Sequence, residues 1–143
     1  MTQSLGHKAL VHFGKLVVEE VRDWAIGDWD KKIDGRMKGG PEEEKWRARM
    51  KALGPDAEQL LKELLPEIVD ATLHFMMFLL ERGGVMGLKL SVTTEDGETF
   101  PDINEVSDGL AGDLVMWIPA FSKQRHKPLP PILAAELSRF VEK

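Results

Sequence analysis

The sequence predicts a single α+β domain over residues 1–143, mainly helical, with about five helices around a long central helix and one small β-hairpin. Two patterns support this fold class. Apolar residues recur at three- and four-residue steps over most of the chain, which is typical of amphipathic helices. Between residues 86 and 93 the pattern becomes an alternation, which is typical of a half-buried strand. A chain of 143 residues is long enough for one domain and too short for two comfortable ones.

The first part of the chain is predicted to form two helices joined by a glycine-rich linker. The first helix is expected over about residues 5–26. Its inner face would consist of Leu10, Phe13, Val17, Val21 and Trp24. Arg22 and Asp23 would then fall on the outer side. After the linker, Pro41 suits the first turn of a second helix, which Gly54 ends.

The long central helix is predicted over residues 56–82, where Pro66 should cause a kink or separate two abutting helices. Its inner face would be Leu61, Leu64, Ile68, Phe75 and Leu79, and its polar stripe would be Glu63, Glu67, Asp70, His74 and Glu81. From residue 73 to residue 80, apolar side chains surround the helix on nearly all sides. This part must be covered by the hairpin and the terminal helix or by another subunit, which leaves self-association as a homodimer open.

The last part of the chain contains the hairpin and one clear helix. Residues 86–93 are expected to form a strand, Asp96-Gly97 a tight turn, and residues 98–100 a short returning strand. Residues 114–118 are either a third strand or the end of a helix that begins near Ile103, and Pro119 should end either element. A final helix is expected over residues 132–141.

Composition excludes several classes of function. The absence of cysteine removes disulfides, zinc–thiolate sites and cysteine nucleophiles, and it fits the cytoplasm. The net charge of −5 argues against nucleic-acid binding, because that function needs a basic surface. The longest apolar run, residues 75–80, is far shorter than the ~20 residues that cross a membrane.

Asp70 and His74 are the candidate catalytic residues. They are four residues apart on one helical face, where a carboxylate can orient a histidine as a general base. Glu20, Glu67, Asp70 and His74 form the candidate metal site, because paired E-x-x-D motifs on facing helices hold magnesium in all-helical nucleotide pyrophosphatases. The structural alternative is a buried His74 whose tautomer is fixed by a hydrogen bond to Asp70.

Three strings resemble a family of short, uncharacterised bacterial cytoplasmic proteins that contain a domain of unknown function. They are VEEVRDW (18–24), LPEIVDATLH (65–74) and SDGLAGDL (107–114), the last followed by WI (117–118) and FSK (121–123). The resemblance covers about residues 17–125, although the family pattern has a few more residues between the third string and WI. It implies a bacterial, cytoplasmic origin and assigns no site residue.

The function expected from the sequence is that of a non-enzymatic protein-binding domain, immunity- or adaptor-like, without a cofactor. The serines lie outside G-x-S-x-G motifs, and no glycine-rich segment has the lysine of a phosphate-binding loop. The size, the acidity and the apolar central helix suit an interaction module. The alternative is a small metal-dependent hydrolase, nucleotide pyrophosphatase-like, in which a divalent ion such as Mg²⁺ binds the helical carboxylates and His74.

Overall fold

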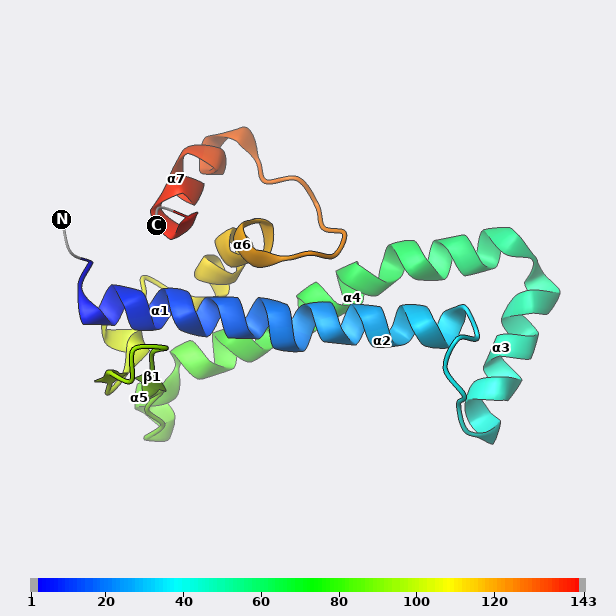
Figure 1. Cartoon of the computed structure of the whole chain (residues 1–143), viewed down its shortest axis with the longest axis horizontal. Helices are drawn as coiled ribbons and strands as arrows, with labels where there is room; N and C mark the ends of the chain where they lie inside the picture. Colours follow the sequence, from blue (N-terminus) through cyan, green and yellow to red (C-terminus); the bar gives the residue numbers. More distant parts are fainter. Residues whose placement is uncertain (1–2, 142–143) are drawn as a thin grey trace.

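The computed structural model describes residues 3–141 and shows a mainly helical α+β fold built on two antiparallel helical rods (Figure 1). The first rod is an unbroken succession of α1 (Leu5–Leu16), the π-helical segment η1 (Val17–Arg22) and α2 (Asp23–Ile33). Helix α3 (Pro41–Leu53) turns the chain at the end of this rod. The second rod is α4 (Pro55–Glu81), which returns beside the first as the expected long central helix.

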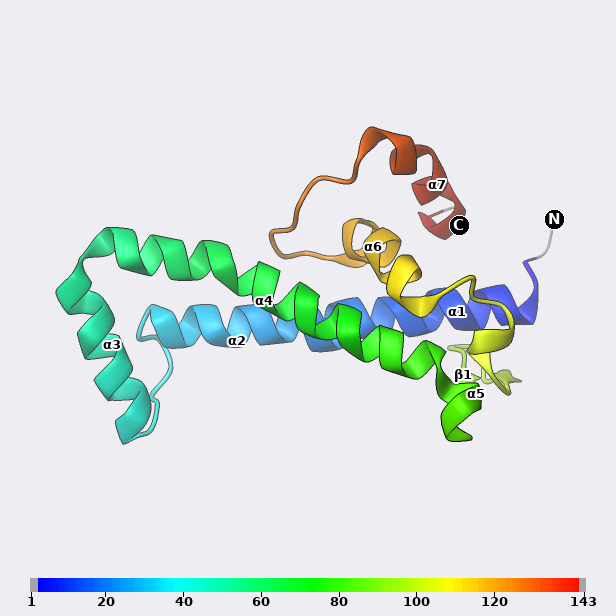
Figure 2. The same ribbon diagram turned by 180° about the vertical axis from the view of Figure 1, so that it is seen from behind.

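The remaining elements gather around one half of the rods. A short helix α5 (Gly83–Met86) leads to the hairpin of β1 (Val92–Thr93) and β2 (Thr99–Phe100), and a 3₁₀ turn η2 (Ile103–Glu105) follows. Helix α6 (Leu110–Phe121) packs against both α1 and α4, and the last helix, α7 (Pro131–Val141), packs on α6 (Figure 2). Within residues 3–141, no helix combines the length and the apolar character needed to cross a membrane.

The π-helical segment changes which side of the first rod faces the core. In η1 the Asp23 backbone N–H bonds to the Val18 carbonyl, five residues back, so the turn holds one more residue than an α-helical turn. The following side chains are therefore rotated away from the positions that an α-helical wheel predicts. Arg22 and Asp23, expected outside, are buried, whereas Val21 and Trp24, expected inside, are exposed.

Helix α4 buries a different face from the expected one. Leu65, Leu73 and Met77 are buried against the first rod and α6, whereas Leu64, Ile68, Phe75 and Leu79 of the expected inner face are exposed. The prediction failed because apolar residues surround this helix from residue 73 to residue 80, so periodicity does not single out one face there. The chain continues through Pro66 as one helix, and its axis changes direction partway along (Figure 2).

The hairpin is confirmed but shorter than expected. Val92 pairs with Phe100 and Thr93 with Thr99 in antiparallel register, and Gly97 takes a positive φ of 83° in the turn. The predicted start of the first strand belongs instead to α5, which occupies residues 83–86. Residues 114–118 are helical and lie within α6, which starts at Leu110 rather than near Ile103 and continues past Pro119.

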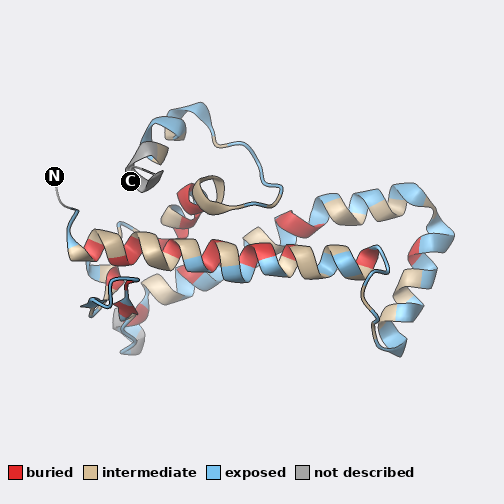
Figure 3. Ribbon diagram, in the orientation of Figure 1, coloured by how far each residue is buried: buried red, intermediate tan, exposed pale blue. Residues whose placement is uncertain are grey.

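Two cores stabilise the fold. The larger core joins α1, η1, α4 and α6 around Trp117, whose side chain is fully buried. The indole lies directly over Gly14 of α1, where a Cβ atom would come within 2.4 Å of the ring. The smaller core joins α2, α3 and α4 through Ile26, Ile33, Met50 and Leu65. Buried residues gather along the first rod, whereas much of α3 and the adjoining part of α4 is exposed (Figure 3).

Candidate functional site

A buried polar cluster around Arg22 joins the two rods to the segment that follows α6. The Arg22 guanidinium forms a bidentate pair with Asp70 of α4, with Nε–Oδ1 and Nη2–Oδ2 distances of 2.5 and 3.0 Å. It also donates to Ser122 Oγ at 2.9 Å, to the Arg125 carbonyl oxygen at 3.0 Å and to Asp23 Oδ1 at 3.3 Å. These five bonds match the five N–H donors of a guanidinium, so the buried charge is fully satisfied.

Asp23 completes this cluster from the first rod. Its carboxylate accepts hydrogen bonds from Ser122 Oγ and from the Lys123 backbone N–H, both at 2.7 Å. The C-terminal end of α6 is thereby held against the junction of η1 and α2. The inward rotation that η1 causes is what places Asp23 and Arg22 within reach of this end of α6.

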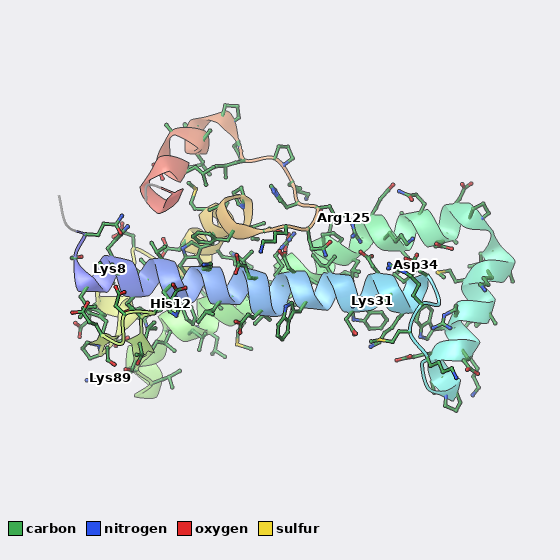
Figure 4. The ribbon with its side chains drawn as sticks, viewed as in Figure 1. Lys8, His12, Lys31, Asp34, Lys89 and Arg125 are labelled. Carbon is green, nitrogen blue, oxygen red and sulfur yellow. The ribbon has the colours of Figure 1, made fainter. Side chains whose placement is uncertain are left out.

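Residues 122–130, here called the strap, cross from α6 over both rods before α7 begins. Arg125 forms a bidentate pair with Asp30 of α2, at 2.7 and 2.9 Å, and donates to the Lys62 carbonyl oxygen of α4. Arg125 thus anchors the strap where α2 and α4 lie side by side (Figure 4). Further along the strap, Lys127 Nζ lies 2.7 Å from Glu67 Oε2.

A groove of about 420 Å³ lies between α4, α6 and the strap. Its apolar walls come from α6 and from the proline-rich end of the strap, and include Leu114, Val115, Ile118 and Leu129. Its polar rim comes from α4 and Lys127. A concave, mostly apolar space with a few polar groups at one edge has the general character of a ligand pocket.

The structure brings three of the four predicted metal-site residues to this groove. Glu67, Asp70 and His74 all line it, whereas Glu20 is exposed on the first rod. The structural alternative, a buried His74 tied to Asp70, is wrong. Asp70 accepts its hydrogen bonds from Arg22, and His74 is exposed beside Phe75, with ring centroids 5.7 Å apart.

The charges at the groove are already balanced. The Asp70 carboxylate is paired with Arg22 and the Glu67 carboxylate with Lys127. A hard cation such as Mg²⁺ needs several carboxylate or carbonyl oxygens turned toward one point. Among residues 3–141, no group of three histidine, aspartate or glutamate side chains is arranged to hold a metal ion.

The face of α4 that points away from the first rod carries a row of exposed apolar side chains. We call it the outer face; its members are Leu60, Leu64, Ile68, Phe75, Phe78 and Leu79, all exposed. The most exposed are Phe75, at 71%, and Ile68, at 57%. Figure 2 shows α4 in front of the first rod, with α6 and α7 above it. These six side chains are uncharged, and the polar stripe with Glu63 and Glu67 runs along one border.

A second polar cluster caps the start of α6. Glu81, at the end of α4, accepts a hydrogen bond from the Ala111 backbone N–H at 3.1 Å. Ser107 Oγ donates to Asp113, and it accepts from the Gly109 backbone N–H. Burial raises the pKa of the Asp113 carboxyl, the Ser107 hydrogen bond opposes this rise, and the nearby charges of Asp108 and Glu81 add to it. The cluster joins α4 to α6, and its chemistry is that of a helix cap.

Sequence reasoning missed Arg22 and the strap. Arg22 stands close to three acidic residues, Glu19, Glu20 and Asp23, and such a charged run usually marks a solvated helix surface. No periodic pattern predicts a π-helical turn. The pairing of the strap with Asp30 and Glu67 joins residues far apart in the chain, which no local sequence pattern predicts.

Comparison of the chain with models of protein families, with curated proteins and with solved structures finds no match.

Proposed function

We propose that this protein is a non-enzymatic protein-binding module, adaptor- or immunity-like, that acts through the outer face of α4. The single observation that carries the proposal is the exposure of six large apolar side chains along one face of a helix inside a well-packed fold. A contiguous exposed apolar patch of this kind typically marks a surface that another protein covers.

Helix α3 borders the outer face at Leu60 and Leu64, and the elements after α4 leave the part from Ile68 to Leu79 open. The hairpin packs against α1, and α7 packs against α6. The hairpin and the terminal helix therefore do not cover the apolar part of α4 in the way that the sequence had led us to expect. The other alternative was coverage by another subunit, and the proposal extends it to a protein partner in general.

The energetic reasoning follows from the size of these side chains. Each leucine, isoleucine or phenylalanine that moves from water into an interface contributes roughly 1.5–3 kcal/mol when fully buried. Ile68 and Phe75, near the middle of the outer face, are the natural anchors, because interface energy concentrates in a few central apolar or aromatic residues.

The hydrolase alternative finds less support in the contacts. The carboxylates of Asp70 and Glu67 are already paired with Arg22 and Lys127. Glu20 does not line the groove that Glu67, Asp70 and His74 line. A bacterial cytoplasm is the setting we propose, because the sequence resembles bacterial cytoplasmic proteins and a cysteine-free chain needs no oxidising compartment.

A photo-crosslinking experiment in the cells that produce the protein tests the proposal. A benzophenone side chain would replace Phe75 in one variant and Glu98, at the exposed hairpin turn, in a control variant. We expect irradiation to attach a protein to the Phe75 variant and not to the Glu98 variant. Equal or absent crosslinking at the two positions would contradict a binding role for the outer face.

A toxin gene beside the gene for this chain would favour an immunity role within this proposal. A nucleotide-metabolism operon would instead favour the hydrolase alternative.

A further inference from the structure

We propose that the occupant of the outer face is a second copy of this chain, packed antiparallel so that α4 of one copy crosses α4 of the other at a two-fold axis. This inference rests on the proposed protein-binding function and names its partner. Three properties of the face support it: the spacing of its residues, its charge, and its position on the molecule.

Four of the six residues of the outer face form two pairs that are symmetric about the junction of Ala71 and Thr72; Leu60 and Phe78 have no such counterpart. Ile68 and Phe75 lie equally far from this junction on either side, and so do Leu64 and Leu79. An antiparallel two-fold axis through the junction would place Ile68 of one copy against Phe75 of the other. Such a match is what an isologous interface requires, because the same patch must complement itself.

The residues at the junction permit a close crossing. Ala71 and Thr72 are exposed, and they are smaller than the large apolar residues on either side of them. Small side chains at the crossing point allow two helix axes to approach to the lower end of the usual ~8–10 Å. From Leu64 to Leu79 the face extends over about 22 Å, at a rise of ~1.5 Å per residue.

The charges of the face favour the antiparallel arrangement. Two copies that each carry a net charge of −5 repel one another, so contact is easiest through an uncharged face. Arg82 lies at the C-terminal end of the face, with its guanidinium 5.9 Å from the Phe78 ring, and Glu63 lies near the N-terminal end. An antiparallel pair would place Arg82 of each copy opposite Leu61 of the other, about 3 Å along the helix from Glu63, whereas a parallel pair would set Arg82 against Arg82.

The position of α4 leaves room for a second copy. Figure 2 shows α4 as the element nearest the viewer along the middle of the molecule, with α6 and α7 displaced above it and α3 at its far end. Two copies joined through this face would form a four-helix layer from the two pairs of rods.

Sedimentation of the purified chain over a range of concentrations tests the inference. We expect a species of twice the 16.1 kDa chain mass at high concentration, and a monomer for Phe75→Glu and for Ile68→Glu with unchanged circular dichroism. Ile132→Glu, at an exposed apolar position on α7, is the matched control and should dimerise like the unmodified chain. A chain that remains monomeric at about 100 μM would overturn the inference.

Single cysteines test the orientation, since the natural chain has none to interfere. Ala71→Cys should form an intermolecular disulfide on mild oxidation, because the two copies of this residue would lie near the axis. Arg82→Cys should not, because the two copies would lie at opposite ends. Ready crosslinking of Arg82→Cys without that of Ala71→Cys would refute the antiparallel arrangement. The charge swap gives a second readout: Arg82→Glu and Glu63→Arg should each weaken dimerisation, and the double variant should restore it.

These results separate the inference from the proposed function. If the purified chain is monomeric while benzophenone at Phe75 captures a protein of another mass in cells, the self-association fails and the protein-binding function stands. If Phe75 captures nothing and the chain is monomeric, both fail.

Discussion

Arg22 and Asp70 lie 48 residues apart in the sequence and form a buried ion pair that joins the two helical rods. The Arg22 side chain is fully buried, and its partner carboxylate is partly exposed at the groove. Because a π-helical turn is what rotates Arg22 inward, the pair couples a local irregularity of the first rod to the packing of α4 and the strap.

Replacement of Arg22 by methionine should destabilise the protein strongly. It would leave Asp23 and Asp70 without their cation, and breaking a buried ion pair from one side costs roughly 3–5 kcal/mol. Arg22→Lys should rescue little of this loss, because an ammonium group cannot make the bidentate pair. Urea denaturation gives the free energy of unfolding. Arg36→Ala, which removes an exposed pair with Asp34, is the control and should cost less than ~1 kcal/mol. Equal losses for the two variants would refute a structural role for Arg22.

The contact between Gly14 and Trp117 predicts opposite effects for two glycine-to-alanine changes in helices. Gly14→Ala should destabilise by roughly 1–3 kcal/mol, since its methyl group would overlap the buried indole and force the ring to move. Gly112→Ala in α6, where a Cβ meets nothing within 4 Å, should stabilise by up to about 1 kcal/mol through helix propensity. Thermal denaturation of the two variants measures the difference, and a Gly14→Ala variant as stable as Gly112→Ala would contradict the packing described.

Asp113 predicts a pH-dependent stability. The pKa of its carboxyl group is raised above the ordinary value of 3.8 in the folded protein, so the folded state binds the proton more tightly than the unfolded state does. As the pH rises above 3.8, ionisation of Asp113 therefore lowers the free energy of unfolding. Asp113→Asn should therefore be more stable than the natural chain at pH 7. This advantage should shrink as the pH falls to 3.8 and below. Urea denaturation at several pH values checks it, and a constant or reversed difference would show that ionisation of Asp113 does not disfavour folding.

Divalent metal ions should leave the melting temperature unchanged. Arg22 and Lys127 already neutralise Asp70 and Glu67, so the groove offers no set of free carboxylates to Mg²⁺ or Mn²⁺. Differential scanning fluorimetry with millimolar metal provides the measurement. An upward shift that Glu67→Gln abolishes would revive the metal-dependent hydrolase alternative.

The sequence predicted the elements better than the faces by which they pack. Proline and glycine marked the ends of α3 and the start of α4, and Asp96-Gly97 marked the hairpin, because these residues act through local backbone geometry. The side of α4 that is buried could not be predicted, since apolar residues surround it from residue 73 to residue 80 and the choice depends on distant partners such as Trp117.

The first rod illustrates the same limit at the candidate site. Leu10 and Val17 of the predicted inner face are buried, as expected. Beyond Val17 the π-helical turn shifts the buried face, so that Arg22 and Ile26 are buried instead of the predicted residues. The sequence placed Glu67, Asp70 and His74 on one face of α4, and all three line the groove. It did not reveal that Arg22 and Lys127 would hold the two carboxylates, because those contacts depend on the tertiary fold.

The size of the species in which the protein occurs in a native extract shows directly whether the outer face of α4 binds a protein. The tagged natural chain and its Phe75→Glu variant would be compared by size-exclusion chromatography under identical conditions. If the outer face of α4 is a protein-binding surface, the natural chain will elute well above its 16.1 kDa monomer mass and the variant will elute as a monomer. Co-elution of the two chains at one size would contradict the account.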